Sequence, residues 1–91
     1  MTDSELLEMI VSEIVAEPRH VEVKRSIDEQ GVLLTLSLAK EDMGKVIGRQ
    51  GNTITGIRTV MRAAGMKQGA RVNVKILEPE GSEQYGNQER Q

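Results

Sequence analysis

The spacing of the apolar residues changes along the chain from a helical period to an alternating one and back, and this order restricts the fold more than any other feature. Helical spacing covers the N-terminal segment, through Leu6, Leu7, Ile10, Val11, Ile14 and Val15. Thr2 and Glu5 have the spacing of a capping box at its start. Pro18 predicts that this helix ends near Ala16 or Glu17. We therefore expect an amphipathic helix that packs on another element.

Two segments of alternating spacing follow, which predicts two strands. The first places Val21, Val23 and Ile27 on one face and Glu22, Lys24 and Ser26 on the other. The second places Val32, Leu34, Leu36 and Leu38 on one face, opposite Thr35 and Ser37. Because Arg25 interrupts the apolar face of the first strand, we expect that strand to lie at an edge or to fray. The turn signal Asp-Glu-Gln-Gly at residues 28–31 predicts a hairpin.

Helical spacing returns in the second half of the chain, where we expect a short helix from about residue 42 to 47 and a longer one from about residue 52 to 64. The apolar stripe of the longer helix is Ile54, Ile57, Val60, Met61 and Ala64. Gly65 and Gly69 bracket its exit. A last strand at residues 71–77 places Val72, Val74 and Ile76 on one face. The order helix-strand-strand-helix-helix-strand predicts an α+β domain in which the helices cover one face of a three-stranded sheet.

The 91 residues are expected to form one domain, over residues 1–77. Residues 78–91 are acidic and polar without an apolar period, which predicts a flexible tail. The chain has no cysteine, which excludes disulfides and thiolate metal sites. No apolar run reaches the ~20 residues of a membrane span, and the acidic start lacks the basic region of a signal peptide. These features predict a cytoplasmic protein with no membrane partner.

Charge is distributed unevenly along the chain. The formal net charge is −2, yet residues 43–77 contain no Asp or Glu. The cations of this region are Lys45, Arg49, Arg58, Arg62, Lys67, Arg71 and Lys75. A local basic region of this kind favours nucleic acid as a partner, and the plainer alternative is a face that these residues only keep solvated.

The stretch MGKVIGRQGNTI, residues 43–54, carries three glycines near a lysine and invites comparison with nucleotide-binding loops. A P-loop needs G-x-x-x-x-G-K-[ST], whereas Val46 follows Gly44-Lys45 and no glycine lies five positions before Gly44. The dinucleotide fingerprint needs G-x-G-x-x-G, and position 46 is Val. With both motifs excluded, the stretch is either a plain turn between two helices or a loop that meets another ligand.

Three local features favour a ligand-binding loop. The helix before the loop ends on apolar residues at positions 46–47. The helix after it begins at Asn52 and leaves its first backbone N–H groups free, which is an anion site. The two residues between the second and third glycines, Arg49 and Gln50, are a cation and a hydrogen-bonding amide, and neither is an acid. The loop is therefore suited to a sugar-phosphate chain.

These residues carry a resemblance to a known family. VIGRQGNTI, residues 46–54, resembles the V-I-G-x-x-G-x-x-I core of KH RNA-binding domains. The wider run AKEDMGKVIGRQGNTITGIRTVMRAAG is similar to the small bacterial single-KH-domain proteins of the KhpA family. The resemblance covers about residues 6–77 and implies the type II KH arrangement, a three-stranded mixed sheet with helices packed on one face. The position of the motif between two helices makes it specific.

The resemblance implies a protein that clamps the backbone of single-stranded RNA with this G-x-x-G loop, as a post-transcriptional regulator or RNA chaperone. The implied RNA-binding residues are Lys45, Val46, Ile47, Gly48, Arg49, Gln50, Gly51, Asn52, Ile54 and Arg58. The two glycines would let phosphates close on the main chain. Arg49 would face a phosphate, Gln50 would donate a hydrogen bond, and Lys45 and Arg58 would extend the cationic rim. The aliphatic residues, with part of the strand at residues 33–38, would wall a groove for bases.

Other functions are weighed against this one. A dimerising interaction module is the main alternative, since KhpA-like proteins pair with themselves and with a larger KH-containing protein; the helix carrying Ile54 and Ile57 or a sheet edge would supply the contact. Without aromatic stacking, a single domain should bind RNA weakly and gain affinity from a second KH domain. Single-stranded DNA is a further candidate. An enzyme is not expected, because the adjacent Glu41-Asp42 point different ways and His20, the single histidine, reads as a surface residue. No cofactor or metal is expected.

Overall fold

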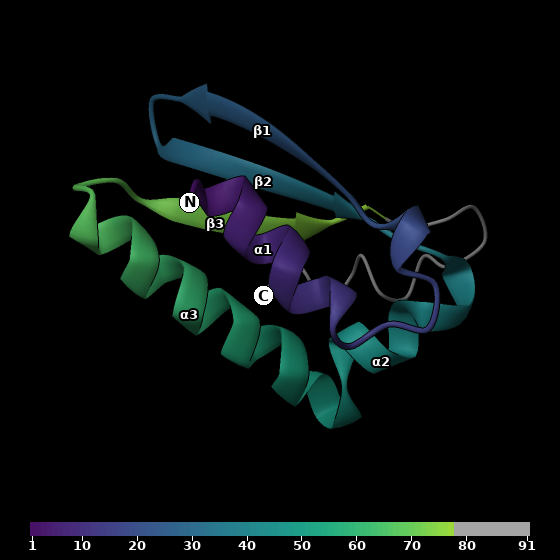
Figure 1. Ribbon diagram of the computed structural model, residues 1–91. Coiled ribbons are helices and arrows are strands. Elements are labelled where there is room, and N and C mark those ends of the chain that lie inside the picture. Colours follow the sequence, from purple (N-terminus) through teal and green to yellow (C-terminus); the bar gives the residue numbers. More distant parts are fainter. Residues whose placement is uncertain (78–91) are drawn as a thin grey trace.

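Three α-helices lie on one face of a three-stranded sheet in this computed structural model, which describes residues 1–77 (Figure 1). The elements are α1 (Asp3–Ser12), β1 (Glu22–Asp28), β2 (Gly31–Ser37), α2 (Met43–Ile47), α3 (Asn52–Lys67) and β3 (Val72–Ile76), with short 3-10 turns at Pro18–His20, Lys40–Asp42 and Arg49–Gly51. The predicted order and α+β class are confirmed. The tail predicted at residues 78–91 lies outside the described residues, so it stays a prediction, as does the boundary at residue 77.

The sheet is mixed, in the order β1-β2-β3. β1 and β2 pair antiparallel through a two-residue turn, in which the Gln30 N–H donates to an Asp28 carboxylate oxygen at 2.8 Å. β2 and β3 pair parallel, with Leu34 beside Val74. Gly31 starts β2 at φ 123°, and a Cβ there would overlap the Arg71 carbonyl oxygen. Glycine is thus required where β2 first meets β3.

The core fills the space between the helices and the inner face of the sheet. Its strand residues are Val32, Leu34, Leu36, Val72, Val74 and Ile76, which confirms the predicted alternation of β2 and β3. Its helix residues include Leu7, Val11, Met43, Val46, Ile47, Ile54, Ile57 and Met61. The core of residues 1–77 contains no aromatic ring, because that part of the sequence holds no Phe, Trp or Tyr. Aliphatic side chains alone therefore position the segment between α2 and α3.

Helix α1 ends earlier than predicted. Its capping box is present, with the Glu5 N–H donating to the Thr2 hydroxyl at 3.1 Å. The regular helix stops at Ser12, rather than near residues 16–17. The reason is that the backbone N–H groups of Ala16 and Glu17 donate to the side chain of Asp42, each at 3.0 Å, which draws the chain away from the helix axis.

Strand β1 lies at an edge of the sheet, as its interrupted apolar pattern predicted. Arg25, the interrupting residue, pairs with Asp3 of α1 at 2.9 Å. Ile27 was expected on a buried face, but its side chain is 67% exposed, because it lies at the hairpin end beyond the cover of the helices. The inner face of β1 is thus buried only near Val23.

Helix α3 continues to Lys67, beyond the predicted end at residue 64. Gly65 does not end the helix; it is buried, and a Cβ there would lie 2.7 Å from both the Ala70 carbonyl oxygen and Val72 Cγ2. The helix ends in a Schellman motif, in which the N–H groups of Gly69 and Ala70 donate to the carbonyls of Met66 and Gly65. Val60, predicted within the apolar stripe, is 49% exposed on the outer side of the helix.

Candidate nucleic-acid interface

The loop between α2 and α3 has a backbone that only glycine adopts easily. Gly48 has φ 79° and ψ 173°, and Gly51 has φ 79° and ψ 11°. Between them, Gln50 takes the left-handed conformation at φ 58°, the single non-glycine residue with positive φ in the described chain. The Gly51 N–H donates to the Gly48 carbonyl at 3.1 Å, which closes the turn. Three positive φ values in four residues make this a shaped loop rather than a plain helix turn.

The two glycines are required for different reasons. A Cβ at Gly48 would overlap the Thr53 hydroxyl and lie 2.8 Å from the Thr53 nitrogen, so both space and backbone conformation require glycine. A Cβ at Gly51 would meet nothing within 4 Å, so only its positive φ favours glycine. Gly44 has open space around it and a helical backbone, so neither space nor conformation requires glycine there. Gly48 is therefore the glycine that defines the loop.

The side chains at the loop tip are exposed. Arg49 and Gln50 make no side-chain hydrogen bond or ion pair with any residue in 1–77. No side chain caps the N-terminus of α3, where Asn52 is the first helical residue. The first N–H groups of a helix carry partial positive charge when uncapped. The loop that carries this cation and this amide lies at one corner of the molecule, at the junction of α2 and α3 (Figure 1).

Lys45, predicted at the cationic rim, has a partner. Its ammonium donates to Asp42 at 3.2 Å, although half of its side chain is exposed. Asp42 is buried, and the amide of Ala16, followed by the amide of Glu17 and the Lys45 ammonium, holds its pKa below the usual value despite that burial. Sequence reasoning missed this role and considered Asp42 only as one of two adjacent carboxylates. The carboxylate ties the chain after α1 to the start of α2.

Arg58, the other predicted rim cation, reaches from α3 toward the sheet. Its Nε donates to the Val74 carbonyl of β3 at 3.2 Å. Partial burial, together with the neighbouring Arg62 cation, lowers the pKa of Arg58. The guanidinium therefore joins α3 to the edge strand, about two helical turns from the loop.

The predicted aliphatic wall is placed differently from the expectation. Val46, Ile47 and Ile54 are all less than 5% exposed and belong to the core. In the predicted strand segment 33–38, every second side chain points into the same core, and the others lie half-buried on the opposite sheet face. These aliphatic residues thus support the loop from beneath instead of forming an open wall beside it.

Residues 1–77 contain neither a metal site nor a membrane-spanning helix. No group of three His, Cys, Asp or Glu side chains is arranged to hold a metal ion there. None of the helices in that part of the chain has the length and apolar character needed to cross a membrane.

Comparison with known proteins places this fold and loop in a family. The KhpA/KhpB KH domain family matches residues 4–76. The RNA-binding protein KhpA of Clostridium acetobutylicum is 47% identical over 73 residues, which are 80% of this chain and 97% of that protein. The RNA-binding protein KhpA of Bacillus subtilis is 40% identical over 81 residues, 86% of this chain and 100% of that protein. Both relatives are named for binding, not for a reaction.

A solved structure shares the fold. The chain matches a crystal structure of Aquifex aeolicus Era bound to GDP.AlF4- with a TM-score of 0.57 and 14% identity. The match covers 84% of this chain and spans only 29% of that one, so it supports the fold alone. The family match over residues 4–76 and the two RNA-binding relatives show that this chain belongs to the KhpA/KhpB KH domain family.

Proposed function

We propose that this protein binds single-stranded RNA by closing the Gly48–Gly51 loop on the sugar-phosphate backbone. The observation that carries the proposal is the loop itself: positive-φ residues present an exposed cation and an exposed amide beside an uncapped helix N-terminus. No acid lies between residues 43 and 77 to repel a phosphate. The RNA-binding names of the relatives support the same ligand.

The chemistry of the clamp follows from these groups. A phosphate would approach the main chain at Gly51, which has open space around it, whereas Thr53 fills the Cβ position of Gly48. Arg49 would pair with a phosphate oxygen, and the Gln50 side-chain amide would donate to a neighbouring oxygen beside the start of α3, where the Asn52 N–H already donates to the Arg49 carbonyl. Lys45 would contribute a weaker attraction, because Asp42 already neutralises part of its charge. Such contacts read the backbone and not the base sequence.

A single domain of this kind should bind weakly, so we propose that a second KH domain adds affinity. Stacking of a base on an aromatic ring is worth roughly 1–3 kcal/mol, and the core and loop offer no such ring. The second domain would be another copy of this chain or a larger KH-containing protein, acting as post-transcriptional regulator or RNA chaperone. Ile54 and Ile57 are buried and cannot supply the contact, whereas Val60 is exposed on α3.

The clamp is tested by placing two acids in the loop. Arg49→Asp with Gln50→Asp should abolish binding to a fluorescent single-stranded RNA while leaving the helical circular dichroism unchanged, since Asp tolerates positive φ. A charge-matched control is Arg19→Asp with Ser26→Asp, at exposed positions away from the loop. Equal RNA affinity for the loop variant and this control would overturn the proposal. The same strand made as DNA would report contacts to the 2′-OH, and a sizing column would test for dimers.

A further inference from the structure

Two adjacent stretches of the chain carry opposite charge. Residues 43–77 hold cations and no acid, and they build α2, the loop, α3 and β3. Residues 78–91, here called the acidic segment, hold one cation, Arg90, and the acids Glu78, Glu80, Glu83 and Glu89. A ligand joined to its site through the same chain acts at an effective concentration of the order of millimolar. The acidic segment is therefore always present as a ligand for the basic surface.

The acidic segment starts level with the loop between α2 and α3. α3 and β3 are joined only by the short turn at residues 68–71 and run in opposite directions (Figure 1). The bond from Arg58 Nε to the Val74 carbonyl fixes their relative position. Asn52 lies about 9 Å along the helix axis from Arg58. Leu77 lies about 10 Å along the strand from Val74, in the same direction. The chain therefore leaves β3 at the level of the first turn of α3.

The loop offers the acidic segment one cation that no acid of the described chain already holds. Arg49 is exposed and makes no side-chain hydrogen bond or ion pair within residues 1–77. Lys45, by contrast, is paired with Asp42. An arginine fork binds a carboxylate and a phosphate with the same geometry. A carboxylate on Arg49 would therefore exclude the phosphate of an RNA strand.

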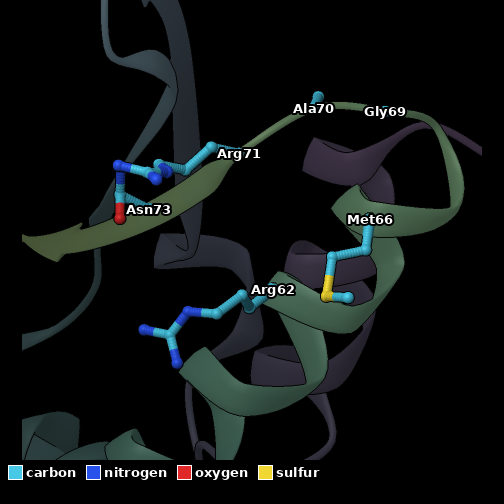
Figure 2. Close-up of a pocket in the computed structure, with 6 residues that line it drawn as sticks. All are labelled: Arg62, Met66, Gly69, Ala70, Arg71 and Asn73. Carbon is cyan, nitrogen blue, oxygen red and sulfur yellow. The ribbon is translucent and has the colours of Figure 1, made fainter.

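The cations at the other end of α3 are a less accessible target. Arg62 and Arg71 line one pocket there (Figure 2). Arg71 precedes β3, so it lies about 20 Å along the strand from Leu77. An extended chain covers at most about 3.5 Å per residue, so Glu80 stays within about 11 Å of Leu77. The first acids of the segment thus reach the level of the loop and not that of Arg71.

We propose that the acidic segment is an internal competitor of RNA, whose carboxylates pair with Arg49 at the loop and must be displaced when a strand binds. The competition rests on the proposed function, whereas the contact between the segment and the loop does not. Basic surfaces attract polyanions of any sequence. The segment raises the affinity that a strand needs, so strands with only weak contacts to the loop are excluded.

The test neutralises the acidic segment in the full chain. The segment variant carries Glu78→Gln, Glu80→Gln, Glu83→Gln and Glu89→Gln. The matched control removes four exposed acids of the N-terminal half that form no ion pair within residues 1–77, through Glu8→Gln, Glu13→Gln, Glu22→Gln and Glu29→Gln. The segment variant should bind a fluorescent single-stranded RNA roughly tenfold more tightly than the control, because several weak pairs no longer oppose the strand. With Arg49→Gln added to both proteins, this gain should fall to about threefold or less.

A measurement without RNA separates the contact from the competition. In proton–nitrogen correlation spectra, the segment variant should shift the backbone amide resonances of Arg49 and Gly51 from their wild-type positions, and the control should leave them in place. Unshifted loop resonances would overturn the proposal. An affinity gain that persists in full with Arg49→Gln would also overturn it, because the segment would then act only through general charge. Shifted resonances with no affinity gain would overturn the competition and count against the clamp, which Arg49→Asp with Gln50→Asp tests separately.

Discussion

The two ends of α3 are built in opposite ways. At the C-terminal end, a Schellman motif satisfies the carbonyls of Gly65 and Met66, and Gly69 supplies the positive φ that the motif needs. At the N-terminal end, no side chain caps the helix, and the preceding loop holds a strained Gln50 instead. One end is closed by backbone hydrogen bonds, and the other has no side-chain cap and directs the positive end of the helix dipole at the loop.

This difference explains what each end can offer to RNA. The N-terminal end carries partial positive charge, and the exposed Arg49 adds to the attraction for an anion there. The C-terminal end carries partial negative charge. The cations near this end are side chains, Arg62 and Arg71, which line one pocket between α3 and β3 (Figure 2).

Of the substitutions at the two ends of α3, Gly48→Ala should change the melting temperature most. This change combines overlap with Thr53 and a backbone conformation that is nearly restricted to glycine, and it should lower the melting temperature by about 15 °C. Gly51→Ala is the matched control, since it adds only the cost of positive φ, and should lower it by about 5 °C. Thermal unfolding followed by circular dichroism measures both. Equal shifts would mean that the overlap at Gly48 is relieved by rotation of Thr53.

The closed end is tested by Gly65→Ala. The added Cβ would press on the Ala70 carbonyl and on Val72, and this should outweigh the gain in helix propensity, for a net loss of about 10 °C in melting temperature. Gly56→Ala, in the same helix with open space around its Cβ, should raise it by about 5 °C. RNA affinity should stay unchanged in both. A stabilised Gly65→Ala protein would show that the closed end packs more loosely than the structure indicates.

The support of the loop is tested by Asp42→Asn. An Asn side chain would set its NH2 group against the N–H groups of Ala16 and Glu17, so the melting temperature near neutral pH should fall by about 7 °C. The folded state lowers the pKa of Asp42, so the stabilisation is complete above the unfolded pKa of about 4 and is lost as the pH falls through the lower folded value. The gap between the two proteins should therefore narrow in acid. A constant gap down to low pH would rule out the ionised carboxylate as its cause.

Asp42 also marks where sequence reasoning reaches its limit. The element order, the Thr2–Glu5 capping box and the G-x-x-G loop were predictable, because each depends on residues a few positions apart. The bonds from Asp42 to Ala16 and Glu17 join residues more than 20 positions apart, and no local pattern marks them. The same holds for the Arg58 contact with Val74, which only the docking of α3 on the sheet brings together.

The sequence also did not predict for every apolar residue whether it would be buried. The apolar run at residues 46–47 and Ile54 fitted an open groove wall as well as it fitted a core, because periodicity identifies an apolar face but not what covers it. The early end of α1 and the long α3 have the same origin, since both helix ends are set by tertiary contacts, to Asp42 in one case and around Gly65 in the other. Local signals gave correct elements, and long-range packing decided their ends.

The smallest effect, and the one that best separates stability from binding at the open end, is expected for Gln50→Gly. Glycine removes the strain of a left-handed Gln, about 1 kcal/mol, but returns part of it as backbone entropy of the unfolded chain, so the melting temperature should rise by only about 2 °C. RNA affinity should fall about threefold in the same protein, because the donor amide is lost. A stabilised variant with weaker binding would mean that the loop keeps a strained residue for its ligand. A destabilised variant with unchanged binding would mean that Gln50 holds the loop together and leaves recognition to Arg49 and the helix N-terminus.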